Sequence, residues 1–109
     1  MKRIENIPPL NALRAFEAVA RYGTIAQTST HLNVSSSSIS QHINSLEARL
    51  KVKLFERRNN RLFLTAEGRE YFEAIRPAFD MISRATTALV ATKEQGPLRI
   101  SVIPSLAHG

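Results

Sequence analysis

The chain has 109 residues, of which 43% are hydrophobic, and this suffices for one small domain with an extension. It contains no cysteine, which excludes disulfides, thiolate metal sites and a thiol nucleophile. No apolar run approaches the roughly 20 residues of a membrane-spanning helix, and the N-terminus lacks the apolar stretch of a signal peptide, so we expect a cytoplasmic protein without membrane contact.

The formal net charge of +6 is unevenly distributed. Residues 1–65 carry ten basic and four acidic side chains, with the basic ones densest over 49–61, whereas residues 66–95 carry four basic and five acidic ones. A basic patch of this kind indicates a polyanionic partner, first of all nucleic acid. An ordinary solvated basic surface is the alternative.

Three helices are expected in the first half of the chain. From Leu10 the apolar residues recur at helical spacing until Gly23 ends the pattern. Thr24 is a suitable N-cap for a short second helix, and Asn33 tolerates the left-handed backbone of a tight turn after it. Ser35 then caps a third helix, whose apolar face comprises Ile39, Ile43, Leu46 and Leu50.

Residues 53–65 predict a small two-stranded wing. Two short apolar runs, Leu54-Phe55 and 62–64, flank a polar tip. Asn59 and Asn60 at this tip can take a positive φ, which suits a hairpin turn.

A long fourth helix is expected over about 66–94, capped by Thr65. Gly68 and Pro77 are defects in its pattern, and Pro77 should kink it. Because a helix this long cannot bury its whole length against so small a domain, we expect its apolar seam to pair with a second subunit rather than serve only an internal core. The seam has near-heptad spacing and comprises Phe72, Ile75, Phe79, Ile82 and Leu89. After Gly96-Pro97, residues 98–104 alternate as one strand, which we interpret as the start of a further domain.

A short helix, a three-residue turn and a longer helix form the plan of a helix-turn-helix. The plan needs a small residue midway along the first helix of the pair, a turn-tolerant residue four positions later, and two apolar residues that pack beyond it. The residues at these four positions are Ser29, Asn33, Val34 and Ile39, and all four fit. Together with the wing and the basic patch they indicate a DNA-binding unit.

On these residues the chain resembles the DNA-binding region of LysR-type transcriptional regulators. The resemblance runs over residues 8–68, with Thr24 at the cap, Val34-Ser35 in the turn and Leu54-Phe55-Glu56-Arg57 in the wing. The segment PPLNALRAFEAVAR resembles the branch that includes glycine-cleavage and β-lactamase regulators. The chain departs from the family pattern at Thr28 and Ser29 (usually Ala), at Lys51 (commonly Gly) and at Gln41 (often Arg).

The resemblance implies a mainly α fold. It places a winged helix-turn-helix of three helices and a two-stranded wing at 1–65, a dimerisation helix at 66–95, and a hinge with the first strand of an effector-binding domain at 96–109. It also implies a homodimer through the long helix and a tetramer in an intact protein. A small-molecule effector would act only through that further domain, and no cofactor is expected.

The resemblance also places the first residues of the third helix in the major groove of DNA. Ser35 is first a helix cap, but its helix end is also a positive dipole that can hold a phosphate. Gln41 can bond bidentately to adenine, so we hypothesise that it reads an A·T pair. Solvated surface is the alternative for the side chains after the cap and on the wing. The candidate DNA contacts are Thr24, Ser35, Ser36, Ser37, Ser40, Gln41, His42, Arg57, Arg58 and Arg61.

The predicted function is therefore sequence-specific binding of double-stranded DNA at a dyad-symmetric promoter site. The alternative is a dimeric interaction module that binds an acidic protein. Catalysis is not expected, because the serines have no general base at a recognisable spacing and Glu47 is interpreted as a structural ion-pair partner. A metal site is not expected either, since the three histidines are scattered.

Overall fold

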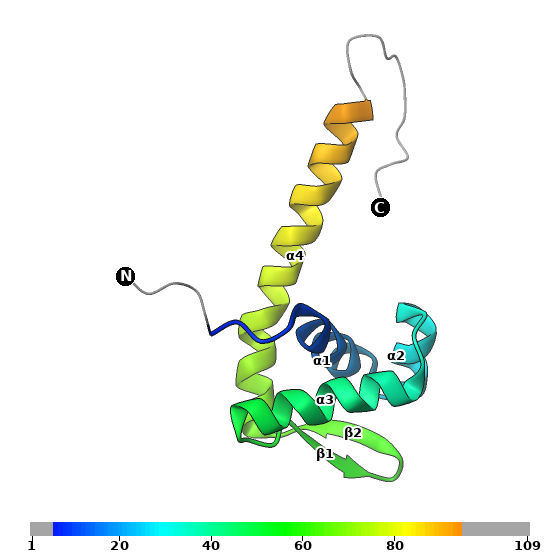
Figure 1. The fold of residues 1–109 in the computed structure, drawn as a ribbon, viewed down its shortest axis with the longest axis vertical. Helices are drawn as coiled ribbons and strands as arrows, with labels where there is room; N and C mark the ends of the chain where they lie inside the picture. The colour runs from blue at the N-terminus through cyan, green and yellow to red at the C-terminus, as the bar shows by residue number, and fades with distance from the viewer. Residues whose placement is uncertain (1–5, 95–109) are drawn as a thin grey trace. The chain divides into compact units, whose positions relative to one another are not determined.

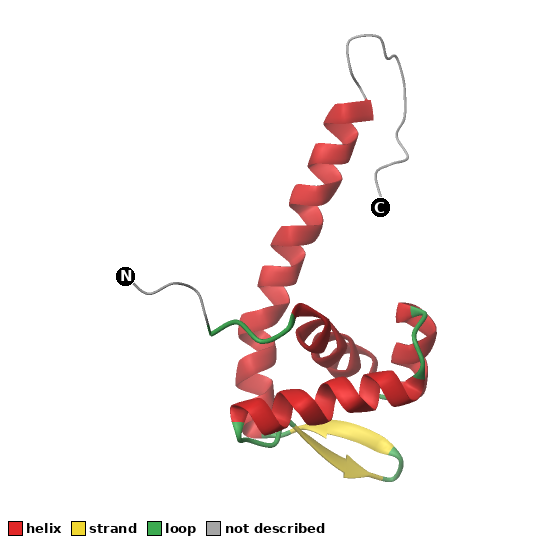
Figure 2. Cartoon of the chain, in the orientation of Figure 1, coloured by secondary structure: helices red, strands yellow, loops and turns green. Residues whose placement is uncertain are grey.

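The computed structural model describes residues 6–94. Their elements are α1 (Leu10–Tyr22), α2 (Ile25–Leu32), α3 (Ser36–Leu50), β1 (Phe55–Arg58), β2 (Arg61–Leu64) and α4 (Ala66–Glu94), as Figures 1 and 2 show. The chain divides into two compact units between Ile75 and Arg76, inside α4. The predicted order of three helices, a two-stranded wing and a long helix is thus confirmed. The proposed strand at 98–104 lies outside the described residues.

The first unit has an aromatic core. Helices α1, α2 and α3 pack on one another, and Phe16 of α1 is fully buried. The Phe16 ring centroid lies 5.5 Å from those of Phe55 and Tyr71 and 6.4 Å from that of Phe72. The first residues of α4 therefore belong to the same core as α1 and the wing. Burial raises the pKa of the Tyr71 hydroxyl above its ordinary value of 10.0.

The predicted helix ends are confirmed in detail. Gly23 ends α1 with φ of 88°, and Asn33 ends α2 with φ of 60°. The side chains of Thr24, Ser35 and Thr65 each accept a hydrogen bond from the backbone N–H three residues later. One further left-handed residue was not foreseen: Lys51 ends α3 with φ of 59°.

The wing comprises β1, the turn at Asn59-Asn60 and β2. Its strands are antiparallel, with Phe55 opposite Leu64 and Arg58 opposite Arg61, and both asparagines have positive φ as expected. The Leu62 N–H donates to the Gly23 carbonyl at 3.2 Å. This bond ties the wing to the α1–α2 turn.

Thr28 is the fully buried residue of α2, and its hydroxyl donates to the Thr24 carbonyl. The interpretation of Gly68 needs correction. Gly68 is not a defect of the helical pattern: a Cβ at this position would lie 2.1 Å from the Leu54 carbonyl oxygen, so the glycine permits a close approach of two backbones. The helix continues through Pro77, and the kink expected there stays a prediction.

Candidate nucleic-acid interface

Helix α3 presents an apolar face to the core and a polar face to solvent. Ile39, Ile43 and Leu46 are buried, as their spacing predicted. On the other side Ser36, Ser37 and Gln41 are exposed, while Ser40 and His42 are half-buried. The exposed side chains are short at the N-terminal end of the helix, so another surface can come close to its backbone there.

Hydrogen bonds fix the turn that sets the direction of α3. The Ser29 hydroxyl donates to the Val34 carbonyl at 2.5 Å, which closes the turn from the α2 side. The Ser35 oxygen accepts from the Ser38 N–H at 3.1 Å, which leaves other N–H groups of the first turn unpaired within the helix. The Thr24 oxygen accepts from the Gln27 N–H, so its own proton is left for a ligand. Both caps therefore have a structural role, and a ligand contact by either one would be additional.

The three arginines of the wing lie in different environments. Successive side chains of a strand point to opposite faces, so Arg57 and Arg58 lie on different faces of the wing. Arg57 lines a cleft against α3 together with Ser40 and Asn44. The Arg58 guanidinium instead lies 4.4 Å from the Phe63 ring centroid, a cation–π contact on the opposite face. Arg61 packs against Gly23, where an added Cβ would lie 2.6 Å from its Nη2.

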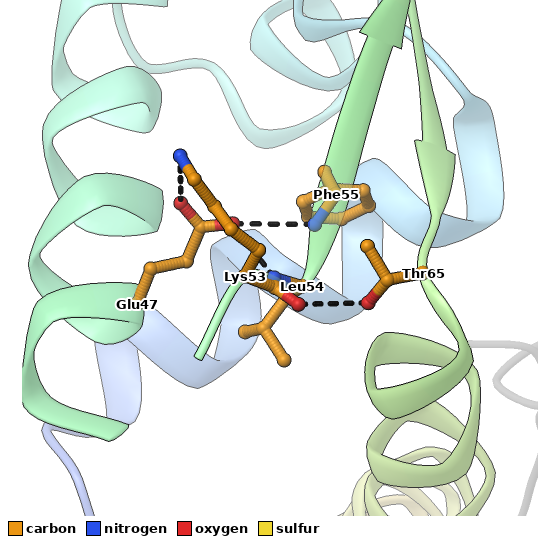
Figure 3. A network of polar contacts seen from close by, with 5 residues as sticks. All are labelled: Glu47, Lys53, Leu54, Phe55 and Thr65. Atoms are coloured by element: carbon orange, nitrogen blue, oxygen red, sulfur yellow. Dashed lines mark hydrogen bonds and ion pairs between the residues drawn. The ribbon is translucent and has the colours of Figure 1, made fainter. Parts of the chain in front are cut away.

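Glu47 joins α3 to the start of the wing (Figure 3). Its Oε2 accepts from the Leu54 N–H at 2.8 Å and the Phe55 N–H at 3.2 Å, and its Oε1 lies 3.6 Å from the Lys53 Nζ. The Thr65 hydroxyl donates to the Lys53 carbonyl at 2.7 Å from the other side. The prediction that Glu47 is a structural ion-pair partner is confirmed, and its two backbone bonds add a role that the sequence did not reveal.

The seam residues of α4 have different environments. Phe72 is half-buried against Phe16, so it contributes to the core of its own unit. Ile82 and Leu89 are 56% and 67% exposed. The pairing role assigned to the seam stays a prediction.

Other kinds of site find no support in the described residues. Within residues 6–94 no three His, Asp or Glu side chains are grouped so that they could hold a metal ion. The helices of that same stretch include none that is long and apolar enough to cross a membrane. His31 is exposed, and its ring stacks on that of Tyr22 with the centroids 4.1 Å apart.

Two solved structures resemble this arrangement. The CbnR DBD–DNA complex matches with a TM-score of 0.66 and 32% identity, over 77% of this chain and 97% of that one. CbnR, described as a LysR family transcriptional regulator, matches with a TM-score of 0.68 and 31% identity, over 80% of this chain and 30% of that one.

The sequence matches known regulators as well. The glycine cleavage system transcriptional activator of Escherichia coli (strain K12) is 43% identical over 103 residues, which are 94% of this chain and 34% of the relative. The carbapenem-hydrolyzing beta-lactamase transcriptional activator of Serratia marcescens is 39% identical over 106 residues, 97% of this chain and 36% of the relative. The chain thus spans about a third of the length of these relatives. These matches confirm the expected resemblance to glycine-cleavage and β-lactamase regulators.

The family described as "Bacterial regulatory helix-turn-helix protein, lysR family" matches residues 10–69, which run from α1 through the wing to the start of α4. This match covers more than half of the chain. The relatives are transcriptional regulators rather than enzymes, and the chain itself belongs to the LysR family of bacterial regulatory helix-turn-helix proteins.

Proposed function

We propose that the chain is the DNA-binding region of a transcriptional regulator that recognises a specific double-stranded site. Helix α3 lies in the major groove, and the wing contacts the backbone or the minor groove of the same site. One observation carries the proposal: α3 is anchored by Ile39, Ile43 and Leu46, while the short polar side chains at its start remain accessible beside a cationic wing. Such a regulator works where the chromosome is, in the bacterial cytoplasm.

The test is selection of bound DNA from a random pool at two salt concentrations. A specific binder enriches a defined sequence at both, and its affinity for that sequence falls steeply with salt because phosphate contacts release counterions. The alternative of an acidic protein partner predicts weak binding to all sequences with no enriched motif. That outcome would reject the proposal.

Gln41 is the residue to which we assign base readout. It is exposed on the same side of α3 as Ser37, and its amide can donate to N7 and accept from the N6 amino group of adenine. We expect Gln41→Ala to lose about 1–3 kcal/mol of discrimination at one A·T position and to leave the other positions unchanged. Repeating the selection with this variant checks the assignment, which fails if the preference at every position persists.

Ser36, Ser37 and Ser40 remain candidates for contact with base edges beside Gln41. The candidate contacts at the helix caps, at His42 and on the wing position the helix rather than read the sequence. Thr24 at the start of α2, Ser35 at the start of α3 and His42 within α3 are proposed to meet phosphates, as are Arg58 and Arg61 on the wing. Loss of one such contact lowers affinity for all sequences alike. It also reduces the slope of log K against log salt by about 1.

We further propose that two copies pair through α4. The seam of Phe72, Ile75, Phe79, Ile82 and Leu89 would supply the contact, with its exposed members Ile82 and Leu89 covered in the pair. Two copies on one duplex would bind two half-sites, which accounts for a dyad-symmetric operator. Sedimentation of the chain and of an Ile82→Asp, Leu89→Asp variant tests this: the variant should be monomeric at concentrations where the chain is dimeric. A tetramer and a small-molecule effector would belong to the longer protein.

A further inference from the structure

We propose that the cleft between α3 and the wing seats one phosphodiester group of the bound DNA, held by Arg57 and Asn44. The inference rests on the proposed function, because the phosphodiester belongs to the duplex that α3 reads. It adds Asn44 to the interface, and it separates Arg57 in role from Arg58.

The cleft has the size and lining of a small polar site. It encloses about 160 Å³, far more than the roughly 15 Å³ that a single water needs. Its lining includes buried Ile43 and Phe55. It also includes exposed Asn44 and Arg57. The lining therefore combines buried apolar side chains with exposed side chains that can donate hydrogen bonds to a ligand.

The donors of the cleft suit a phosphate. The Arg57 guanidinium has a planar fork of N–H groups that matches two phosphate oxygens, and the Asn44 amide adds two donors. Ser40 lies four residues before Asn44 on α3, so its hydroxyl is on the same helix face and lines the same cleft. Among residues 6–94 neither Asn44 nor Arg57 makes a side-chain hydrogen bond or ion pair. Their donors are therefore available to a ligand.

The net charge of the cleft lining also complements that of a phosphodiester. Three ionised side chains line it: Lys53, Arg57 and Glu47. The Glu47 carboxylate already accepts two backbone N–H bonds and lies within ion-pair distance of Lys53, so its negative charge is offset locally. The lining carries one net positive charge, and a phosphodiester carries one negative charge.

The position of the cleft agrees with the way a winged helix meets DNA. The sugar-phosphate backbone of one strand forms the ridge between the major and minor grooves. With α3 in the major groove and the wing toward the minor groove, that ridge passes between the two elements. The space between α3 and the wing is the cleft, so a backbone phosphate is the group that reaches it.

Single methylphosphonate substitution tests the proposal, because it replaces one charged phosphodiester by a neutral group. Duplexes of the selected operator, each with one substitution, are titrated with the unaltered chain. We expect one position per half-site to lower affinity on the order of ten- to hundredfold. In Arg57→Ala this position should lose its effect while the other sensitive positions keep theirs.

Two further variants sharpen the result. Arg58→Ala is the matched control, since it removes an arginine from the adjacent position on the opposite face, and the penalty at the cleft position should remain. Asn44→Asp places a second carboxylate beside the phosphate, so it should weaken binding to the natural duplex. The neutral methylphosphonate at the same position should then restore part of that binding.

The outcomes separate this inference from the proposed function. The inference is overturned if no phosphate depends on Arg57, if Arg58→Ala removes the same penalty, or if Asn44→Asp is not relieved by the neutral group. In those cases sequence-specific binding still stands. If the chain selects no sequence at all, the proposed function fails first. Arg57 and Asn44 are both exposed, and circular dichroism of each variant confirms that it is folded.

Discussion

Replacing Gly68 by alanine is the sharpest test of how the first unit is built. The new Cβ would lie 2.1 Å from the oxygen and 2.9 Å from the carbon of the Leu54 carbonyl. Leu54 cannot easily yield, because its N–H donates to Glu47 at 2.8 Å and its carbonyl accepts from the Thr65 N–H at 3.0 Å. The clash therefore acts on a backbone that is held from two sides.

The expected loss follows from three terms. Overpacking of a buried site costs about 2 kcal/mol, and weakening the Leu54–Thr65 hydrogen bond costs about 1 kcal/mol more. Alanine regains about 1 kcal/mol over glycine from helix propensity. The net change in the free energy of unfolding is then a loss of about 2 kcal/mol. For a domain of this size it lowers the thermal midpoint by about 8–16 °C.

Urea unfolding followed by far-ultraviolet circular dichroism measures this change. Ala74→Gly is the matched control, because Ala74 is exposed in α4 and reports helix propensity alone, with an expected loss of about 1 kcal/mol. If the close approach were unimportant, Gly68→Ala would instead stabilise the chain by about 1 kcal/mol. A neutral or stabilising result for Gly68→Ala would refute the reasoning.

Two other substitutions test neighbouring features. Lys51→Gly should raise the free energy of unfolding by about 1 kcal/mol, because Lys51 ends α3 with φ of 59° and only glycine takes that conformation without strain. The control is Lys51→Ala, which keeps the Cβ and should show no such gain in urea unfolding. Glu47→Ala should lower the free energy of unfolding by about 2 kcal/mol, since the N–H groups of Leu54 and Phe55 lose their acceptor. Glu47→Gln retains an oxygen for those groups and should lose less than half as much, whereas equal losses would assign the effect to the ion pair with Lys53.

The helix ends could be predicted from the sequence because capping is a local interaction. Thr24 and Ser35 accept from N–H groups three residues away, and Gly23 and Asn33 take left-handed conformations that their residue types favour. Lys51 takes the same conformation against its preference. Nothing in its residue type reveals this, although its place where the family commonly has glycine was the available signal.

The close approach at Gly68 could not be predicted from periodicity. Within α4 alone the glycine only interrupts an apolar pattern. Its reason is the Leu54 carbonyl, which lies fourteen residues earlier in the sequence and reaches Gly68 only after the wing has formed. Contacts of this kind depend on the register and placement of β1 and β2, and no spacing rule along one helix contains that information.

The interface was partly predictable for a similar reason. Helical spacing places Ser36, Ser37 and Gln41 on the exposed side of α3, and the structure agrees. The separation of Arg57 from Arg58 follows from the alternation of side chains along β1, which a charge count ignores. Asn44 was missed because it belongs to no motif, although its place one helical turn after Ser40 was a usable signal.

The spacing between α3 and the wing is set by residues that need not touch DNA. The segment 53–55 continues into β1, binds α3 through Glu47, and binds the start of α4 through Thr65 (Figure 3). Gly68 lets α4 approach this segment closely enough for the last of these contacts. A change at any one contact therefore shifts the wing relative to α3, and with it the distance between Asn44 and Arg57. Recognition by this chain accordingly depends on the contacts that join α3, the segment 53–55 and the start of α4, as much as on the polar face of α3.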